Sequence, residues 1–254
     1  MTNQELVSEN KNVQNLAEPR VLEIAVSTVE SLHAALEGGA DRIELCAALS
    51  TGGLTPDQTF IEYSVSLCKQ FRVPIAIMIR PRPGSFVYDN RESNLMLRSI
   101  AVARAADASA LVSGALLPNG RIDPVLTQRL VEAAQGLPLT FHRAFDESPE
   151  QTEDLHLLHQ IGVQRLLTGG GRGPATPAGL QRLAQHNQNR ITLIAAGGLR
   201  PSSLSPLLEI PGLREFHSAA TSAVTQAVSK DSHHYAADPQ ADAATVRALK
   251  KMLE

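Results

Sequence analysis

Ionisable side chains recur in this sequence inside short apolar segments of the kind that proteins bury. Glu44 and Cys46 alternate with isoleucine and leucine, and His142 and His217 each follow a phenylalanine. Successive side chains of a β-strand point to opposite faces, so the ionisable residues should share one buried face. A buried charge costs several kcal/mol unless it is paired, so these residues should compensate one another or bind a ligand. The set comprises Glu23, Arg42, Glu44, Arg80, His142, Arg165, Glu215 and His217.

Two kinds of chemistry suit these residue types. Histidines near carboxylates perform general acid–base catalysis, and the predicted catalytic residues are Glu44, His142 and His217. A thiol is a soft ligand for a metal such as Cu(I), and Cys46 is the predicted metal ligand. The alternative for Cys46 is that of a small buried filler at the end of a strand, which is the commoner role of a lone cysteine.

Another set of residues is suited to binding an anion. Arginine donates paired hydrogen bonds to carboxylates and phosphates, and glycine lets backbone N–H groups approach such a ligand closely. The predicted ligand-binding residues follow the ends of apolar segments and are Arg80, Arg82, Arg143, Asp146, Gly169, Gly170, Gly197 and Gly198. Glycines in such loops also serve purely conformational needs. Arg42 and Arg165 lie at the starts of apolar segments, and together with Glu215 they are interpreted as an internal salt-bridge network near the barrel floor.

The elements that must position these residues alternate between strand and helix. Helix-start signals pair a capping residue with proline at Thr55, Asp123, Ser148 and Thr176. Apolar runs predict eight strands, at 21–26, 41–46, 74–80, 109–113, 137–142, 163–168, 191–196 and 213–217. Because helices separate the strands, the strands should be parallel.

Eight such units predict an α/β fold of one domain, a (β/α)8 TIM barrel with parallel strands over residues 21–254, preceded by a polar leader at 1–20. Active sites of this fold lie at the C-terminal ends of the strands, where the candidate residues fall. The longest irregular stretch is 219–239, and its adjacent His233 and His234 are interpreted as solvated.

Composition narrows the range of partners. The net charge of −3, with no basic cluster, argues against a nucleic-acid partner. No apolar run is long enough to span a membrane, which argues against a membrane partner. The chain contains two cysteines and no disulfide framework, which predicts a cytoplasmic protein.

Several stretches resemble the family called copper homeostasis protein CutC, from about residue 21 to residue 220: LEIAVSTVES, GGADRIELCAALSTGGLTP, IMIRPRPGSFVY, LVSGALLPNGRID, LPLTFHRAFD, RLLTGGG and REFHSAA. The resemblance implies a cytoplasmic (β/α)8 barrel, a homodimer or larger homo-oligomer, and a role in copper homeostasis. It also implies that Cys46 is a copper ligand. Some relatives have a second cysteine one strand earlier, where this chain has Ala25.

Two functions from different classes remain open at this point. The first is a copper homeostasis protein that binds copper. Because Cu(I) prefers two or three soft ligands, Cys46 would have to recruit Met78, His142 or His217. The second is an enzyme that acts on a small anionic metabolite, bearing phosphate or carboxylate, by general acid–base chemistry.

Overall fold

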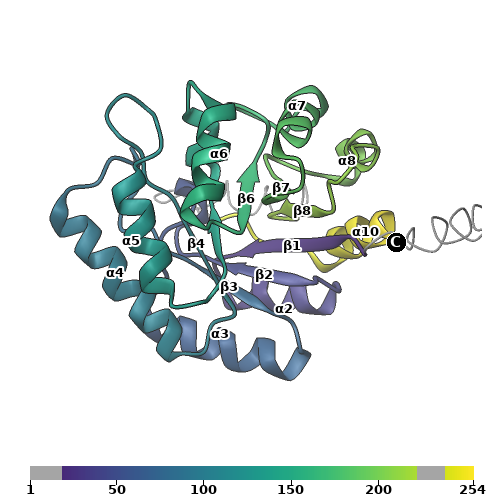
Figure 1. The fold of residues 1–254 in the computed structure, drawn as a ribbon. Coiled ribbons are helices and arrows are strands. Elements are labelled where there is room, and N and C mark those ends of the chain that lie inside the picture. Colours follow the sequence, from purple (N-terminus) through teal and green to yellow (C-terminus); the bar gives the residue numbers. More distant parts are fainter. Residues whose placement is uncertain (1–18, 222–237) are drawn as a thin grey trace, which may run out of the picture.

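The computed structural model describes residues 19–221 and 238–254 and shows a closed barrel of parallel strands surrounded by helices (Figure 1). The strands follow one another in chain order, and β8 pairs with β1 to close the barrel. They are β1 (Val21–Val26), β2 (Arg42–Leu45), β3 (Ile75–Met78), β4 (Ala110–Ser113), β5 (Leu139–Phe141), β6 (Arg165–Thr168), β7 (Thr192–Ala195) and β8 (Glu215–Ser218). The predicted parallel (β/α)8 barrel is confirmed.

Most observed strands are shorter than the apolar runs that predicted them. The run at 74–80, for example, corresponds to β3, which ends at Met78. Ile79 still donates its N–H to the Val112 carbonyl, and Arg80 remains buried. The apolar pattern therefore predicts which residues are buried, and burial extends beyond the last residue of the regular strand. Most of the predicted leader at 1–20 and of the irregular stretch, including His233 and His234, lies outside the described residues.

Helices cover the outside of the barrel (Figure 1). The α-helices are α2 (Val29–Glu37), α3 (Gln58–Phe71), α4 (Asn90–Ala105), α5 (Pro124–Ala134), α6 (Gln151–Ile161), α7 (Pro177–Asn187), α8 (Pro201–Leu208) and α10 (Ala243–Leu253). Short 3₁₀ helices, η1 (Leu49–Thr51) and η2 (Arg143–Glu147), follow β2 and β5. Among the described helices, none is long and apolar enough to cross a membrane.

Two of the four predicted helix caps are confirmed and two are wrong. Asp123 and Thr176 cap α5 and α7 with their side chains. The Thr55 hydroxyl instead accepts a hydrogen bond from the backbone N–H of Arg80, and α3 begins later, after Asp57. The Ser148 hydroxyl donates to Asp154, and α6 begins after Glu150. In both wrong predictions, the hydroxyl that was expected to cap the helix forms a hydrogen bond with another group.

The barrel interior differs from the layer between strands and helices. Outward side chains such as Ile24 and Ile43 form one continuous apolar core with the helices. The interior contains two small apolar clusters beside its buried polar side chains. The first cluster comprises Cys46, Ala76, Met78, Ala110 and Val112, and the second comprises Leu167, Ile194 and Ala196.

The floor of the barrel carries a buried ionic network. Arg42 donates to Glu23 over 2.5 Å and also to Glu215. Arg165 approaches the same Glu215 carboxylate at 3.7 Å. The predicted network of Arg42, Arg165 and Glu215 is thus confirmed, with Glu23 as an additional member.

Helix α10 covers the seam where the barrel closes, because it packs against α2, α8 and β1. Gly38 at the end of α2 allows the close approach of α10. A Cβ atom at Gly38 would lie 2.4 Å from Cβ of Val246 in α10, far inside contact distance. The seam therefore depends on the absence of a side chain at residue 38.

We predict that Gly38→Ala lowers the free energy of unfolding by about 1–3 kcal/mol, because the added methyl group overpacks a rigid contact. Denaturation in urea measures the change. Val246→Gly removes the Cβ atom that the methyl group would meet, so the double variant should lose less than the sum of the two single losses. Strictly additive losses would contradict this account of the seam.

Candidate functional site

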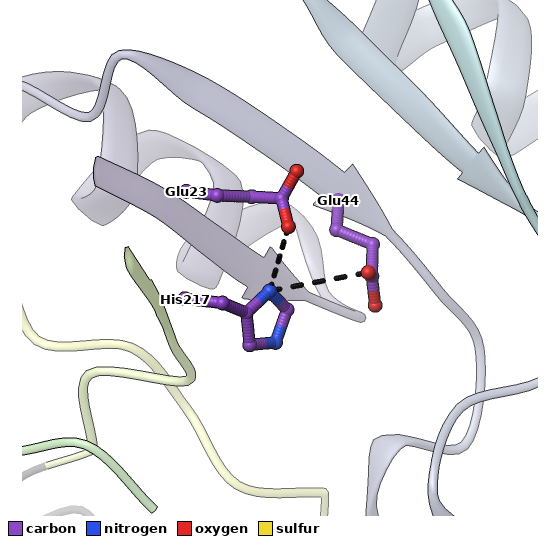
Figure 2. A group of neighbouring side chains, drawn as sticks. All are labelled: Glu23, Glu44 and His217. Atoms are coloured by element: carbon purple, nitrogen blue, oxygen red, sulfur yellow. Dashed lines mark hydrogen bonds and ion pairs between the residues drawn. The ribbon is translucent and has the colours of Figure 1, made fainter. Parts of the chain in front are cut away.

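Glu23, Glu44 and His217 converge inside the barrel from β1, β2 and β8 (Figure 2). The strand register places Glu23 beside Arg42 on one side and His217 on the other. Glu23 Oε1 lies 2.7 Å from His217 Nδ1, and Glu44 Oε2 lies 3.9 Å from the same nitrogen. Nδ1 is therefore held between two carboxylates, while Nε2 is directed away from Glu23 (Figure 2).

The charges within this group favour a protonated His217. Burial raises the pKa of Glu23, but Arg42 and His217 outweigh burial and lower this pKa to about 2. Burial alone would lower the pKa of His217, yet the carboxylates of Glu44 and Glu23 raise it above its ordinary value. Burial, aided by the charge of Glu23, raises the pKa of Glu44. The group can thus hold a proton in more than one place.

Cys46 extends the group toward the end of β2. Its thiol donates to Glu44 Oε1 over 3.3 Å, whereas Glu44 Oε2 has no hydrogen-bond partner among the described residues. Burial, followed by the charge of Glu44, raises the pKa of Cys46 well above its ordinary value. The thiol is therefore protonated and hydrogen-bonded, with a carboxylate positioned to accept its proton.

Met78 brings a second sulfur atom to the same place. Cys46 and Met78 belong to one interior cluster, and both lie beside Gly53 of the loop after β2. A Cβ atom at Gly53 would lie 3.0 Å from Cys46 Sγ and 3.4 Å from Met78 Cε. A side chain at residue 53 would press on both sulfur-bearing side chains.

His142 occupies the other side of the barrel, at the end of β5. Its Nδ1 accepts the N–H of Ala144, so Nε2 carries the ring proton. Burial and the charge of Arg80 lower the pKa of His142 to about 3, and the ring is neutral at neutral pH. Gly114 makes room for this ring, since a Cβ atom there would lie 2.5 Å from Nδ1.

The two arginines after β3 have different surroundings. Arg80 is buried, and its guanidinium donates to the carbonyls of Thr51, Gly53 and Gly84. Arg82 is half-buried and pairs with Glu92, the first turn of α4. The structure therefore places Arg80 in the barrel and turns Arg82 toward the α4 surface.

The predicted ligand residues after β5 and β6 form one connected group. Asp146 accepts hydrogen bonds from Arg143 Nε, the Thr168 hydroxyl and the N–H of Gly169. Arg143 also donates to the Gly173 carbonyl. Arg143, Asp146 and Gly173 border a cavity of about 490 Å³, which Phe86, Glu147 and Arg172 also line.

Two of the predicted glycines allow loops to pack closely. A Cβ atom at Gly170 would lie 2.6 Å from the backbone of α7, and one at Gly197 would lie 2.8 Å from Ala175 N. Both residues also have positive φ angles, as does Gly198. The conformational interpretation of the glycine runs explains these positions without a ligand.

The donor atoms offer two kinds of metal site. Glu23, Glu44 and His217 place one ligand atom each within 4.8 Å of one another, a set suited to harder divalent ions. Arg42 already neutralises Glu23, and a protonated His217 fills the space between the carboxylates. Cys46 and Met78 instead offer sulfur, which suits Cu(I).

Three residues of this region were not among the predicted site residues. Glu23 alternates with apolar neighbours in its strand, so the signal that identified Glu44 also applied to it. Gly114 and Phe86 carry no such local signal, because their importance comes from contact with His142.

Comparison with known proteins identifies the family and agrees with the fold. A family model described as the CutC family matches residues 20–222. A protein of Agrobacterium fabrum named as a family protein CutC is 40% identical to this chain. The match covers 92% of this chain and 94% of the Agrobacterium fabrum protein. A protein of the same name from Pasteurella multocida is 37% identical to this chain. That match covers 77% of this chain and 80% of the Pasteurella multocida protein.

A solved structure is also similar. It is the crystal structure of a protein from Streptococcus agalactiae described as a candidate copper homeostasis protein, CutC. The two chains are 30% identical with a TM-score of 0.75, over 79% of this chain and 98% of the other.

We predict that Glu44→Gln lowers the pKa of His217, because a carboxylate that favours the imidazolium is replaced by a neutral amide. NMR titration of the histidine rings measures this, with exposed Glu153→Gln as the control. Folding raises this pKa, so His217 contributes stability below about pH 6.5 that is lost as the pH rises through the folded value. An unchanged titration of His217 in Glu44→Gln would contradict the arrangement.

Proposed function

Because this chain belongs to the CutC family, we propose that it handles copper in the cytoplasm and binds one Cu(I) ion at Cys46. The observation that carries the proposal is the meeting of Cys46 and Met78 on Gly53, which brings a thiol and a thioether to one buried place. Cu(I) selects such soft ligands over carboxylates. The description of the Streptococcus agalactiae relative as a candidate copper homeostasis protein supports the same function.

A histidine is the natural third ligand. Nδ1 of His142 accepts a backbone N–H, and Nδ1 of His217 is bound to Glu23. In both rings Nε2 is therefore the nitrogen left for an ion. To bind a metal through Nε2, the neutral His142 ring must move its proton to Nδ1 and give up the hydrogen bond from Ala144, whereas His217 must lose a proton.

Glu44 gives Cys46 a route to lose its proton. The thiol must become a thiolate to bind Cu(I), and its raised pKa opposes this step. As the sulfur–copper bond forms, the thiol proton moves to Glu44 Oε1, its hydrogen-bond partner. Burial, which raises the pKa of Glu44, makes this carboxylate a suitable acceptor. The net charge of the pair then increases only by that of the ion.

Other predictions from the sequence stay predictions. They include the homodimer or larger oligomer, the catalytic roles of Glu44, His142 and His217, and an enzyme that acts on a small anionic metabolite. The acid–base groups are compatible with catalysis, but their hydrogen bonds are also explained by the internal network and by proton transfer from Cys46.

We predict that Cys46→Ser abolishes stoichiometric Cu(I) binding and that Met78→Leu, which keeps the volume, weakens it at least about tenfold. Anaerobic titration of the reduced protein against a competing chelator measures the affinity. Because Glu44 keeps the thiol proton and none is released to solvent, wild-type affinity should change little with pH around neutrality.

Cys68→Ser is the matched control, because Cys68 is also a buried thiol but lies in α3, in the outer apolar core. It should bind Cu(I) like the wild type. Equal affinity in Cys46→Ser and wild type would refute the proposal. Equal affinity in Met78→Leu and wild type would remove the thioether from the ligand set.

A further inference from the structure

Three of the eight histidines of the chain meet at one hollow of the outer surface. His156 and His159 lie on α6, and His186 lies on α7, which packs beside α6 (Figure 1). The hollow has a volume of about 20 Å³, which is room for one water molecule or one ion. Because α6 and α7 end just before β6 and β7 begin, the hollow lies toward the barrel floor, whereas Cys46 follows β2 at the opposite end.

The ring of His186 is held as the ring of a metal ligand is held. Its Nδ1 lies 2.8 Å from the carbonyl oxygen of Arg182. Since a carbonyl only accepts, Nδ1 carries the ring proton and the lone pair of Nε2 is free. Histidines that bind metals usually donate their second nitrogen to a carbonyl or carboxylate, because this hydrogen bond fixes the tautomer and the orientation of the ring.

His159 offers a second imidazole at the same hollow. It follows His156 by three residues, so both rings emerge from one face of α6. The His159 ring forms no hydrogen bond with the described residues. His159 and His186 each lie in the last turn of their helix, where the helix dipole favours a positive charge. Two helix ends therefore favour a cation at this place.

A side-chain cation already lies at the hollow. Arg190 is one of its lining residues, and its guanidinium donates to His156 Nδ1 over 3.3 Å. Arg190 also donates to Gln188, at the end of α7. A positive charge thus already lies against an imidazole lone pair here, and Arg190 competes with any metal ion for His156.

We propose that His159 and His186, joined by His156 once Arg190 releases it, bind a divalent transition-metal ion such as Zn²⁺. Imidazole nitrogen suits divalent zinc, copper and nickel, whereas Cu(I) prefers sulfur. The site contains no sulfur and shares no residue with the proposed Cu(I) site. It therefore goes beyond copper handling and stands or falls separately from it.

The three histidines must turn about their side-chain bonds to share one ion. Among the described residues, only the group of two carboxylates and one histidine inside the barrel already brings three donor atoms within 4.8 Å of one another. All three histidines of the hollow are exposed, so their rings can turn without disturbing the core. Binding should therefore be moderate in affinity, because the ion orders side chains that are free before it arrives.

Titration of the full-length Cys46→Ser protein with Zn²⁺ against a competing chelator measures the site, since the Cys46 thiolate could itself bind Zn²⁺. We expect one ion to bind with a Kd of about 10 µM or tighter and to shift the ring ¹⁵N resonances of His159 and His186. His186→Ala should weaken this binding at least about tenfold. Arg190→Gln should strengthen it severalfold, because it removes a competing charge.

His33→Ala on α2 is the matched control, because the His33 ring contacts Tyr63 and lies outside the hollow. It should bind Zn²⁺ like the Cys46→Ser parent. Shifts confined to His217 would place the ion inside the barrel and overturn the proposal, as would equal affinity in His186→Ala and the parent. Binding that Arg190→Gln does not strengthen would refute the competition for His156. With Cys46 present, His186→Ala should keep the wild-type affinity for Cu(I), so the two sites can fail independently.

Discussion

The arrangement of the barrel interior depends on the buried guanidinium of Arg42. It binds Glu23 and Glu215, which come from the two strands that flank the point of closure. Glu23 is thereby fixed with one oxygen on Arg42 and the other on His217. A slip of one residue in the β1–β2 register would turn these side chains to the apolar outer face. The ion pairs therefore specify the register, whether or not they add net stability.

From this anchor the polar contacts extend to the end of β2. Glu23 orients His217, His217 approaches Glu44, and Glu44 accepts the thiol hydrogen of Cys46. Each of these groups lies next to one of opposite charge or to a hydrogen-bond partner, so the charges in this half of the barrel balance one another. The half around β3 and β5 is different, because Arg80 and His142 are buried beside one another with donors left over. The two halves of the barrel interior thus differ in their chemistry: carboxylates and sulfur meet in one, and hydrogen-bond donors meet in the other.

Much of this could be predicted from the sequence, because strand alternation is a local property. It placed Glu44, His142 and His217 inside the barrel without knowledge of their partners. It could not pair Glu23 with His217, which are 194 residues apart and meet only when the barrel closes. Alternation also ends where a strand ends. Arg82 follows Arg80 by two residues, yet it lies in a loop and pairs with Glu92 on α4. The hydroxyls of Thr55 and Ser148 failed as cap signals because the same oxygen suits a cap or a contact with the neighbouring loop.

The close contact between Gly38 and α10 has a consequence for the order in which the chain folds. Helix α10 follows all eight strands in the sequence, but it packs against α2 and β1, which are among the first elements to be synthesised. On the ribosome, the part of α2 that α10 covers therefore remains exposed until every strand has been made. Early strands and helices can pair as they emerge, but the seam joins them to the chain's last described helix. This part of the nascent protein is the surface for which a chaperone has the longest time to compete.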